Sequence, residues 1–476
     1  MKFISFHSVP LGILLLGQSY YDPTWPPLFS MSTVIIGGGI IGLSTAYYLC
    51  RSQSQLANPS IHIVDSSPAL LTSASGYAGG FLALDWFTPA AASLGALSFR
   101  LHRELAREND GQRRWGYAGS HVYSLSIEQR GIGEGRKARG EDWLLEGTSR
   151  AGASGRSTYT WSREAGQSNE VLNDDGTPAW ITPQVGGSVD TISSPEECAQ
   201  VEPKELCDFL LAECEARGVK VHLASRAIGV LTDGSGFLRG LKVQSTNSGQ
   251  ESIDLECKKV VLAAGAWTPK AFETLFPQST LKIPIDPLAG HSIVYKSPRY
   301  KQPFLNPLKP AERMCYAIFC PPGPQWSYAP EAFARLGRNG ETEVWLGGLN
   351  DSSLPLPDLA IDVKGMIDKK SIDDLRRATV QLTGLSKEGQ TLNEDDLDTI
   401  REGLCFRPVS RSGSPILAKV QESDLGVVKT GERSGVWIAS GHGPWGISLS
   451  LGSGLVMSEM LEGKKLSADV EGLGLR

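Results

Sequence analysis

Residues 33–42 constrain the fold of this chain more than any other segment. A short β-branched apolar run leads into closely spaced glycines, and small and apolar residues with helical spacing follow at 41–49. This order predicts a strand, a tight turn and a helix, the arrangement that places a dinucleotide pyrophosphate at a helix N-terminus. The glycines fill the three fixed positions of G-x-G-x-x-G: Gly37, Gly39 and Gly42. The residues between them are expected to belong to the same binding turn: Gly38, Ile40 and Ile41.

Each of the three glycines has its own expected role. Gly37 allows the tight turn, Gly39 lets the backbone approach the phosphates, and Gly42 lets the helix pack closely on the strand. Residues 61–65 predict the next parallel strand, which ends at Asp65. A carboxylate there can accept hydrogen bonds from both hydroxyls of an adenosine ribose and repels a 2′-phosphate, so NAD or FAD is expected rather than NADP. An ordinary glycine turn is the alternative, and it requires neither the flanking elements nor the acid.

Size and composition are those of a two-domain enzyme. The chain has 476 residues, more than the roughly 250–300 that one core usually serves. Its net charge of −6 and the lack of a long Lys/Arg run give no basic surface, so no nucleic-acid partner is expected. Eight cysteines without a C-x-x-C pair argue against a disulfide framework or zinc ribbon. Seven scattered histidines without H-x-x-x-H spacing give no indication of a metal site.

The first 30 residues are expected to lie outside the fold. Lys2 and the apolar stretch 9–17 resemble a short signal-peptide core, which is too short for a membrane span of about 20 apolar residues. Three interpretations stay open: a signal peptide, a short anchor, or a start codon assigned upstream of Met31. We favour the last because residues 20–27 are aromatic and proline-rich without an A-x-A cleavage site. A cytoplasmic protein without integral membrane association is then expected.

Two further segments differ sharply in composition. In residues 72–81, seven of ten are Gly, Ala or Ser, which lets the main chain approach a flat or anionic ligand. A flexible loop without a ligand is the alternative. Residues 129–175 are polar and poor in aliphatic side chains, and predict a long surface insertion.

The remaining patterns predict two kinds of sheet. Helical patterns are found at 91–107, 205–216 and 372–385, and strand patterns at 219–223, 227–231, 258–264, 290–295, 314–319, 333–336 and 343–346. Strand 258–264 is expected to be a buried parallel strand that returns the chain to the nucleotide sheet, whereas the strands after residue 284 follow one another without helices. We expect an α/β fold with a Rossmann-like dinucleotide-binding domain on a parallel sheet, plus a substrate domain with a mostly antiparallel sheet. The expected boundaries are 31–110, 191–285 and 401–476 for the first domain, and 111–190 and 286–400 for the second.

Four blocks of the chain resemble the D-amino-acid oxidase and glycine/sarcosine oxidase superfamily of FAD-dependent oxidoreductases. They are 34–42 with Asp65, 73–81, 260–267 and 406–442. In the last block, Phe406-Arg407-Pro408 resembles the family's R-P-x-x-x-D-G-x-P strand, and 438–443 resembles its A-x-G-H-G turn. The resemblance covers residues 32–463 outside the insertion and is nearest to a little-characterised fungal-type branch.

The last block favours FAD over NAD. Gly441, Gly443 and Gly446 let the main chain crowd a flat ring, and 447–461 then reads as a helix whose N-terminus faces that turn. In the family, the N1/C2 carbonyl edge of the isoalloxazine lies there and gains negative charge on reduction. A glycine-rich connection between a strand and a helix is the alternative.

The resemblance also implies which residues hold the cofactor. Ser73 and Ser75 would approach the pyrophosphate and the ribityl chain, and the main chain of Ala227 would pair with the adenine edge. The full set implied for FAD is Gly37, Gly38, Gly39, Ile40, Ile41, Gly42, Asp65, Ser73, Ser75, Gly79, Gly80, Ala227, Ala264, Gly265, Trp267, Gly441, His442, Gly443, Gly446 and Ile447. Non-covalent FAD is expected. A covalent link through Cys405 is the alternative, because the sarcosine-oxidase branch carries a flavin-linked cysteine near this position, although followed by a different sequence.

Arg407 is the candidate for substrate binding. In the family's amino-acid oxidases an arginine in this strand grips the substrate carboxylate with two hydrogen bonds and orients the Cα–H at flavin N5. A structural arginine is the alternative, since 411–413 is Arg-Ser-Gly where the family has an acid before the glycine. The resemblance implies an oxidoreductase that oxidises a C–N bond of a small amine or amino acid by hydride transfer, with no protein base assigned. A flavin-containing or flavin-vestigial scaffold in trafficking or assembly, with little turnover, is the alternative, because residues 316–348 contain no lysine that could activate oxygen.

Overall fold

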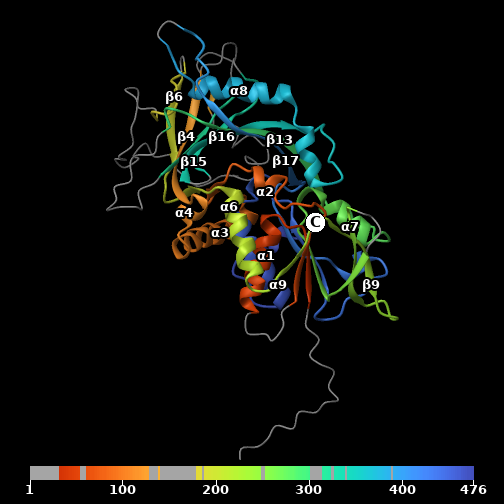
Figure 1. Ribbon diagram of the computed structural model, residues 1–476. Helices are drawn as coiled ribbons and strands as arrows, with labels where there is room; N and C mark the ends of the chain where they lie inside the picture. The colour runs from red at the N-terminus through yellow and green to blue at the C-terminus, as the bar shows by residue number, and fades with distance from the viewer. Residues whose placement is uncertain are drawn as a thin grey trace, which may run out of the picture. The chain divides into compact units, whose positions relative to one another are not determined.

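A computed structural model of the protein confirms the α/β architecture and both kinds of sheet that the sequence predicts (Figure 1). It describes residues 32–53, 60–127, 138–139, 178–184, 187–247, 252–300, 314–322, 326–337, 340–387 and 390–475. Residues 1–30 and, apart from 138–139, the insertion 129–175 lie outside the described residues, so the expectations for them stay expectations.

Among the described residues, six strands form the first sheet, in the order β18-β19-β12-β1-β2-β8. Neighbouring strands are parallel except β18 with β19. The apolar strand that was expected to return to the nucleotide sheet does so, because β12 lies beside β1. The bounds are β1 Thr33–Ile36, β2 Ile61–Val64, β8 Lys220–His222, β12 Lys259–Leu262, β18 Ile416–Lys419 and β19 Gly435–Ser440.

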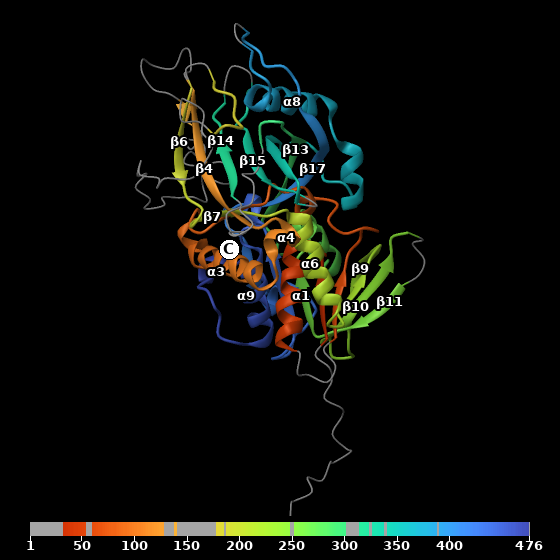
Figure 2. The same cartoon turned by 60° about the vertical axis from the view of Figure 1, so that its left-hand side comes forward.

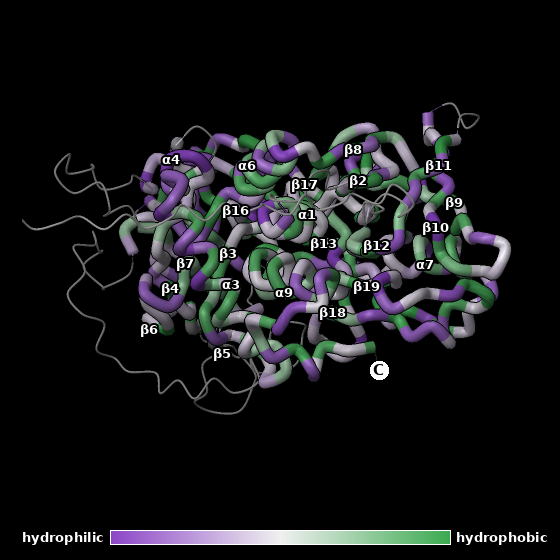
Figure 3. Tube along the Cα trace, turned by 90° about the horizontal axis from the view of Figure 1, so that it is seen from below, coloured by the Kyte–Doolittle hydropathy of each residue, from purple (hydrophilic) through white to green (hydrophobic). Residues whose placement is uncertain are grey.

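Both faces of the first sheet are covered, which is why β1, β2 and β12 are buried along their whole length. Ile35, Ile63 and Val261 face the helices on one side, where α1 packs against both α6 and α9 (Figure 2). Hydrophobic residues are accordingly prominent in α1 and α9 (Figure 3). The helices are α1 Ile40–Ser52, α2 Ala74–Tyr77, α3 Pro89–Glu108, α4 Gly111–Trp115, α6 Pro203–Glu215, α7 Thr268–Leu275, α8 Lys369–Thr383 and α9 Ser450–Glu462.

The other face of the first sheet packs on a small antiparallel sheet and α7. Val34, Val260 and Leu262 share a core cluster there with Leu241 and Phe272. The strands of the small sheet are β9 Ser225–Thr232, β10 Leu238–Ser245 and β11 Ser252–Glu256.

A large sheet of ten described strands runs in the order β17-β13-β16-β15-β14-β4-β7-β3, with β5 and β6 both paired to β4. All of its pairs are antiparallel except β14 with β4. The helix α8 covers its outer face, and aromatic side chains of β3, β14, β15 and β16 meet on its inner face. The strands are β3 Phe81–Ala83, β4 Ala118–Ile127, β5 Ala138–Arg139, β6 Ser188–Ser193, β7 Cys198–Gln200, β13 Ile285–Lys296, β14 Cys315–Phe319, β15 Glu331–Leu336, β16 Thr342–Asp351 and β17 Asp398–Ser410.

The helix expected at 447–461 begins later than predicted. A 3₁₀ turn, η6 Gly443–Trp445, comes first, and α9 starts at Ser450. The carbonyl oxygen of Ile447 explains this start, because it accepts hydrogen bonds from the Ser450 backbone N–H and hydroxyl and lies 3.0 Å from His102 Nε2. The other 3₁₀ helices are η1 Gly265–Trp267, η4 Ala360–Met366, η5 Glu422–Leu425 and η7 Glu471–Leu473.

All eight cysteines lie in the described residues, and all are free thiols. None of the described helices is both long enough and apolar enough to traverse a bilayer.

Candidate cofactor and substrate site

One cavity runs along the carboxyl ends of β1, β2 and β12 and reaches the inner face of the large sheet at β13, β16 and β17. This edge of a doubly wound sheet is where ligands bind in such folds. The expected residues that line the cavity are Gly37, Gly39, Ile40, Ile41, Asp65, Ser73, Ser75, Gly79, Ala227, Ala264, Gly265, Trp267, Arg407, His442, Gly443, Gly446 and Ile447. Four expected residues do not line it: Gly38, Gly42, Gly80 and Gly441.

The three glycines of the turn differ in what lies next to them: two face neighbouring backbone, and one faces open space. A Cβ at Gly37, where φ is +106°, would lie 2.5 Å from the carbonyl oxygen of Ala263. A Cβ at Gly42 would lie 2.0 Å from the carbonyl oxygen of Gly37. At Gly39 it would meet only the Ser75 hydroxyl, at 3.2 Å. The first and third glycines are therefore required by neighbouring backbone, whereas the second leaves open the space at the start of α1.

Asp65 stands at the end of β2 with each carboxylate oxygen already oriented. Oδ2 accepts a hydrogen bond from the Gly38 backbone N–H at 2.9 Å, and Oδ1 accepts one from the Ser67 N–H at 2.9 Å. Gly38 thus contacts Asp65 although it does not line the cavity. Burial raises the pKa of Asp65 above its ordinary value, and the two hydrogen bonds oppose that shift. Two more donors, such as ribose hydroxyls, can still bind the remaining lone pairs.

Residues 73–81, named here the 73–81 loop, are fixed from two directions. The Ser75 hydroxyl accepts from the Ile40 backbone N–H at the start of α1, at 3.0 Å. The Ser73 hydroxyl accepts from the Phe406 N–H on β17, at 3.2 Å. The loop therefore joins the nucleotide turn to the large sheet, and its last glycine, Gly80, has a φ of +85°.

Side chains of the large sheet hold the carbonyl groups of the same loop. Arg401 Nη1 donates to the Gly76 oxygen at 2.8 Å, Trp345 Nε1 to the Tyr77 oxygen at 3.0 Å, and Arg335 Nη1 to the Gly79 oxygen at 2.5 Å. Sequence reasoning missed these three residues. They come from three separate strands, β17, β16 and β15, and no local spacing connects them.

The end of β12 and the segment 354–360 close another wall. Trp267 Nε1 donates to the Pro357 oxygen at 2.8 Å. Asp358 pairs with Arg226 Nη2 at 2.7 Å and with Lys270, and these two cations hold the pKa of its carboxyl below the usual range. All four of these charged and aromatic residues line the cavity.

The turn after β19 brings a buried histidine to the cavity. His442 Nε2 lies 2.9 Å from the Ser453 hydroxyl of α9, and its Nδ1 has no hydrogen-bond partner among the described residues. Burial lowers the pKa of His442 to about 3, so the imidazole is neutral near pH 7. Gly441 and Gly443, with φ of +79° and +55°, form the bends on either side of it.

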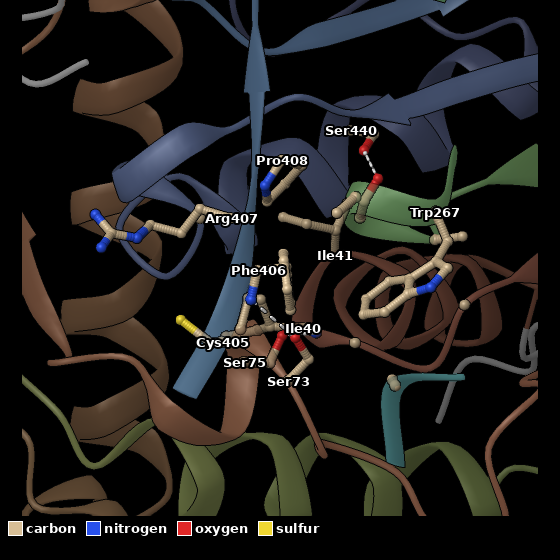
Figure 4. A pocket seen from close by; sticks show the side chains of 18 of the residues that line it. Ile40, Ile41, Ser73, Ser75, Trp267, Cys405, Phe406, Arg407, Pro408 and Ser440 are labelled. Atoms are coloured by element: carbon tan, nitrogen blue, oxygen red, sulfur yellow. Dashed lines mark hydrogen bonds between the residues drawn. The ribbon is translucent and has the colours of Figure 1, made fainter. Parts of the chain in front are cut away.

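Arg407 and Cys405 point to one side of β17, and Phe406 and Pro408 to the other (Figure 4). The guanidinium of Arg407 donates to the amide oxygen of Asn350 on β16 and contacts the Cys405 thiol. To reach Asn350 it passes over Gly290 of β13, where an added Cβ would lie 2.1 Å from Nη2. Burial raises the pKa of the Cys405 thiol, and the guanidinium opposes that shift.

Arg407 carries a charge without a counter-ion in this part of the structure. No carboxylate lies within ion-pair distance of Arg407 among the described residues, whose ion pairs involve other arginines and lysines. Glu331 and Trp345 line the cavity on the neighbouring strands β15 and β16. The arrangement joins a dinucleotide turn to an uncompensated guanidinium in one cavity.

The residues present fit a flavin dinucleotide. The open start of α1 suits a pyrophosphate, and Asp65 suits a ribose. Gly443 and Gly446 line the cavity without a side chain, which leaves room for a flat ring. Known proteins with a similar sequence or fold point to the same cofactor.

The family described as FAD dependent oxidoreductase (DAO) matches residues 32–460. A Schizosaccharomyces pombe protein, C1F5.03c, named only by the general class oxidoreductase, is 25% identical over 93% of this chain and 97% of its own. Glycine oxidase from Bacillus cereus superposes with a TM-score of 0.61 at 17% identity, covering 94% of this chain and 99% of that one. NikD, an amino acid oxidase of nikkomycin biosynthesis, gives 0.63 at 15%, covering 94% and 97%. The chain therefore belongs to the DAO family of FAD-dependent oxidoreductases.

Proposed function

We propose that this protein oxidises a C–N bond of a small amine or amino acid that carries a carboxylate, by hydride transfer to its flavin. The observation that carries the proposal is the guanidinium of Arg407, which lines the cavity without an acidic partner among the described residues. A guanidinium that lines a cavity without an acidic partner can bind an anionic ligand through charge-assisted hydrogen bonds. The structural neighbours named glycine oxidase and amino acid oxidase agree with that class of substrate.

The residues of this chain have separate tasks in such a reaction. The start of α1 and the Ser75 hydroxyl hold the pyrophosphate, and Asp65 holds the ribose. Arg407 binds the substrate carboxylate with its two-pronged guanidinium, and Asn350 fixes the direction of that group. Bound FAD would supply the hydride acceptor.

Several groups in the cavity wall are apolar or uncharged. Trp345 and Phe406 supply apolar surface, and the neutral His442 brings no charge to the turn. No protein base is assigned, because hydride transfer from an uncharged amine requires none.

We further propose that FAD is held without a covalent bond. Cys405 points to the same side of β17 as Arg407, and its thiol contacts the guanidinium. Denaturing the purified protein should release all flavin into the supernatant after precipitation. If flavin stays in the pellet of the wild-type protein but is released from the Cys405→Ser variant, the covalent alternative is established.

Anaerobic reduction tests the proposed reaction. Purified protein should be yellow, with about one FAD per chain, and its flavin absorbance should bleach with at least one member of a panel of amino acids and amines. No bleaching by any of them would favour a flavin-containing scaffold.

Variants of Arg407 then test the carboxylate. Arg407→Lys should keep FAD but raise KM, because a point charge cannot reproduce a two-pronged contact. Arg407→Ala should weaken substrate binding by about 1.5–3 kcal/mol, the usual worth of a charged hydrogen bond. Kinetics equal to wild type in both variants would make Arg407 a structural residue.

A further inference from the structure

We propose that Arg335 and Arg401 are positioning residues that fix the 73–81 loop for cofactor binding from the side of the large sheet. This inference rests on the proposed use of FAD, and it assigns a role to side chains outside the cofactor fingerprint. Neither residue lines the cavity, so both would act through the backbone of the loop.

The 73–81 loop has few features that would make it rigid by itself. Seven of the ten residues 72–81 are Gly, Ala or Ser, and α2 within it is only four residues long. Such a segment loses much conformational entropy when it is ordered. Fixed donors are therefore needed outside the loop.

Three strands of the large sheet supply those donors to successive parts of the loop. The oxygens of Gly76, Tyr77 and Gly79 are bound by Arg401, Trp345 and Arg335 respectively, at 2.8, 3.0 and 2.5 Å. Holding these carbonyls toward the sheet fixes the orientation of the peptide planes between Ser75 and Gly80. The Ser73 and Ser75 hydroxyls are bound on the other side, by the Phe406 and Ile40 backbone N–H groups.

Buried carboxylates lie beside both arginines, and one of them, Glu343, is hydrogen-bonded to Arg335. Arg335 is fully buried, and its Nε and Nη2 donate to Glu343 Oε1 at 2.9 and 2.8 Å. Glu202 Oε1 lies 3.6 Å from Arg335 Nη2 and 3.8 Å from Arg401 Nη2. Among the described residues, two guanidinium groups and two carboxylates thus form one network. Its side chains are oriented before any ligand arrives, because rotating one of them would leave a buried charge unpaired.

Arg401 is the better residue to change, since its side chain is 21% exposed whereas that of Arg335 is 0% exposed. Removing Arg335 would leave buried carboxylates and could prevent folding. Arg401→Gln removes the charge and keeps a donor of similar reach. The matched control is Arg299→Gln: Arg299 is 22% exposed, pairs with Asp396 and donates to the Thr383 carbonyl, and has no contact with the loop among the described residues.

The experiment measures FAD affinity on apoprotein titrated with FAD, together with the free energy of unfolding of each apoprotein. Arg401→Gln should raise the Kd for FAD by about tenfold, the effect of losing one charged hydrogen bond, whereas Arg299→Gln should leave it at the wild-type value. Arg401→Lys should fall between Arg401→Gln and wild type. Added guanidinium ion, compared with sodium at equal ionic strength, should restore FAD affinity in Arg401→Ala but not change wild type.

A purely structural network predicts a different pattern. Arg401→Gln and Arg299→Gln would then both lower the free energy of unfolding while their FAD Kd values stayed equal, and guanidinium would rescue nothing. That result would overturn the proposal. Wild-type protein that binds no FAD would instead refute the proposed cofactor, and wild-type protein that binds FAD but is never bleached would refute the proposed reaction, so the three failures are distinguishable.

Discussion

Gly290→Ala should displace Arg407 without disturbing the fold or the cofactor. Gly290 lies on β13 opposite Cys405, and an added Cβ would stand 2.1 Å from Arg407 Nη2 and 3.0 Å from its Cζ. The atoms that it meets are the end of a flexible side chain, and the φ of Gly290 is not positive. The guanidinium must therefore swing away from Asn350, while the strand itself can stay in place.

The magnitude follows from what the displaced group loses. A hydrogen bond to a charged group contributes about 1.5–3 kcal/mol, so binding of a carboxylate by a misplaced guanidinium should weaken roughly 10- to 150-fold. Alanine is more favourable than glycine within a strand by roughly 0.5–1 kcal/mol, which offsets part of the lost Arg407–Asn350 contact in the free protein. The free energy of unfolding should therefore stay within about 1 kcal/mol of wild type.

The assay needs no knowledge of the natural substrate. Small carboxylates such as acetate and benzoate are titrated into the FAD-loaded protein, and the change in flavin absorbance gives their Kd. Gly229→Ala is the control, because Gly229 also lies in a strand, β9, and its added Cβ meets nothing within 4 Å. If Gly290→Ala bound carboxylates as tightly as wild type and the control, the position of the guanidinium would not determine anion binding.

Three other substitutions probe the cofactor side and the core. Gly39→Val should abolish FAD binding, seen as the flavin-to-protein absorbance ratio, yet leave the apoprotein stable to within about 1 kcal/mol, because its Cβ meets only the Ser75 hydroxyl; a full flavin content would place the pyrophosphate elsewhere. In wild type, FAD affinity should fall as the pH is lowered through the raised pKa of Asp65, since the ionised carboxylate is the form that accepts two ribose hydroxyls, whereas Asp65→Asn should show a flat profile over the same range above the ordinary value of 3.8. Burial lowers the pKa of His102 from 6.5 to about 4, so the unfolded chain binds the proton first and stability falls as the pH drops between those values. His102→Gln, whose amide can still donate to Ile447, should reduce that slope by up to about 1.4 kcal/mol per pH unit in urea unfolding, and an unchanged slope would show that His102 does not titrate on unfolding.

The nucleotide half of the fold could be predicted because its information is local. Residues 33–42 contain the strand, the turn and the helix in one uninterrupted stretch, and Asp65 ends the next strand. The strand β12 could also be assigned, because the short β-branched apolar run after Lys259 is typical of a strand buried on both faces. The changes from helices to successive strands after residue 284 likewise predicted the antiparallel sheet.

The remaining features depend on contacts between distant segments. The Ile447 carbonyl, just before α9, lies within hydrogen-bond distance of His102, 345 residues away, and no local pattern carries that information. Arg335 and Arg401 read as ordinary charged strand residues until the fold places them beneath the 73–81 loop. Gly290 likewise has a role only because Arg407 crosses it. Sequence patterns report periodicity and turns, whereas these roles depend on register between strands.

The strand β17 pairs with β13 from Ser410 to Asp398. The register of this pairing determines which face of the sheet each β17 side chain occupies. Arg401 and Arg407 are an even number of residues apart, so both side chains emerge toward the inner face of the large sheet. An insertion of a single residue between them would turn one of the two guanidinium groups to the opposite face of the sheet, and would separate the anchoring of the 73–81 loop from anion binding. An insertion of two residues would leave both side chains on the same face of the sheet. Among homologues, changes of length should therefore gather before the strand, in residues 385–397, or at the register shift next to Arg401, and between Arg401 and Arg407 should come only in pairs.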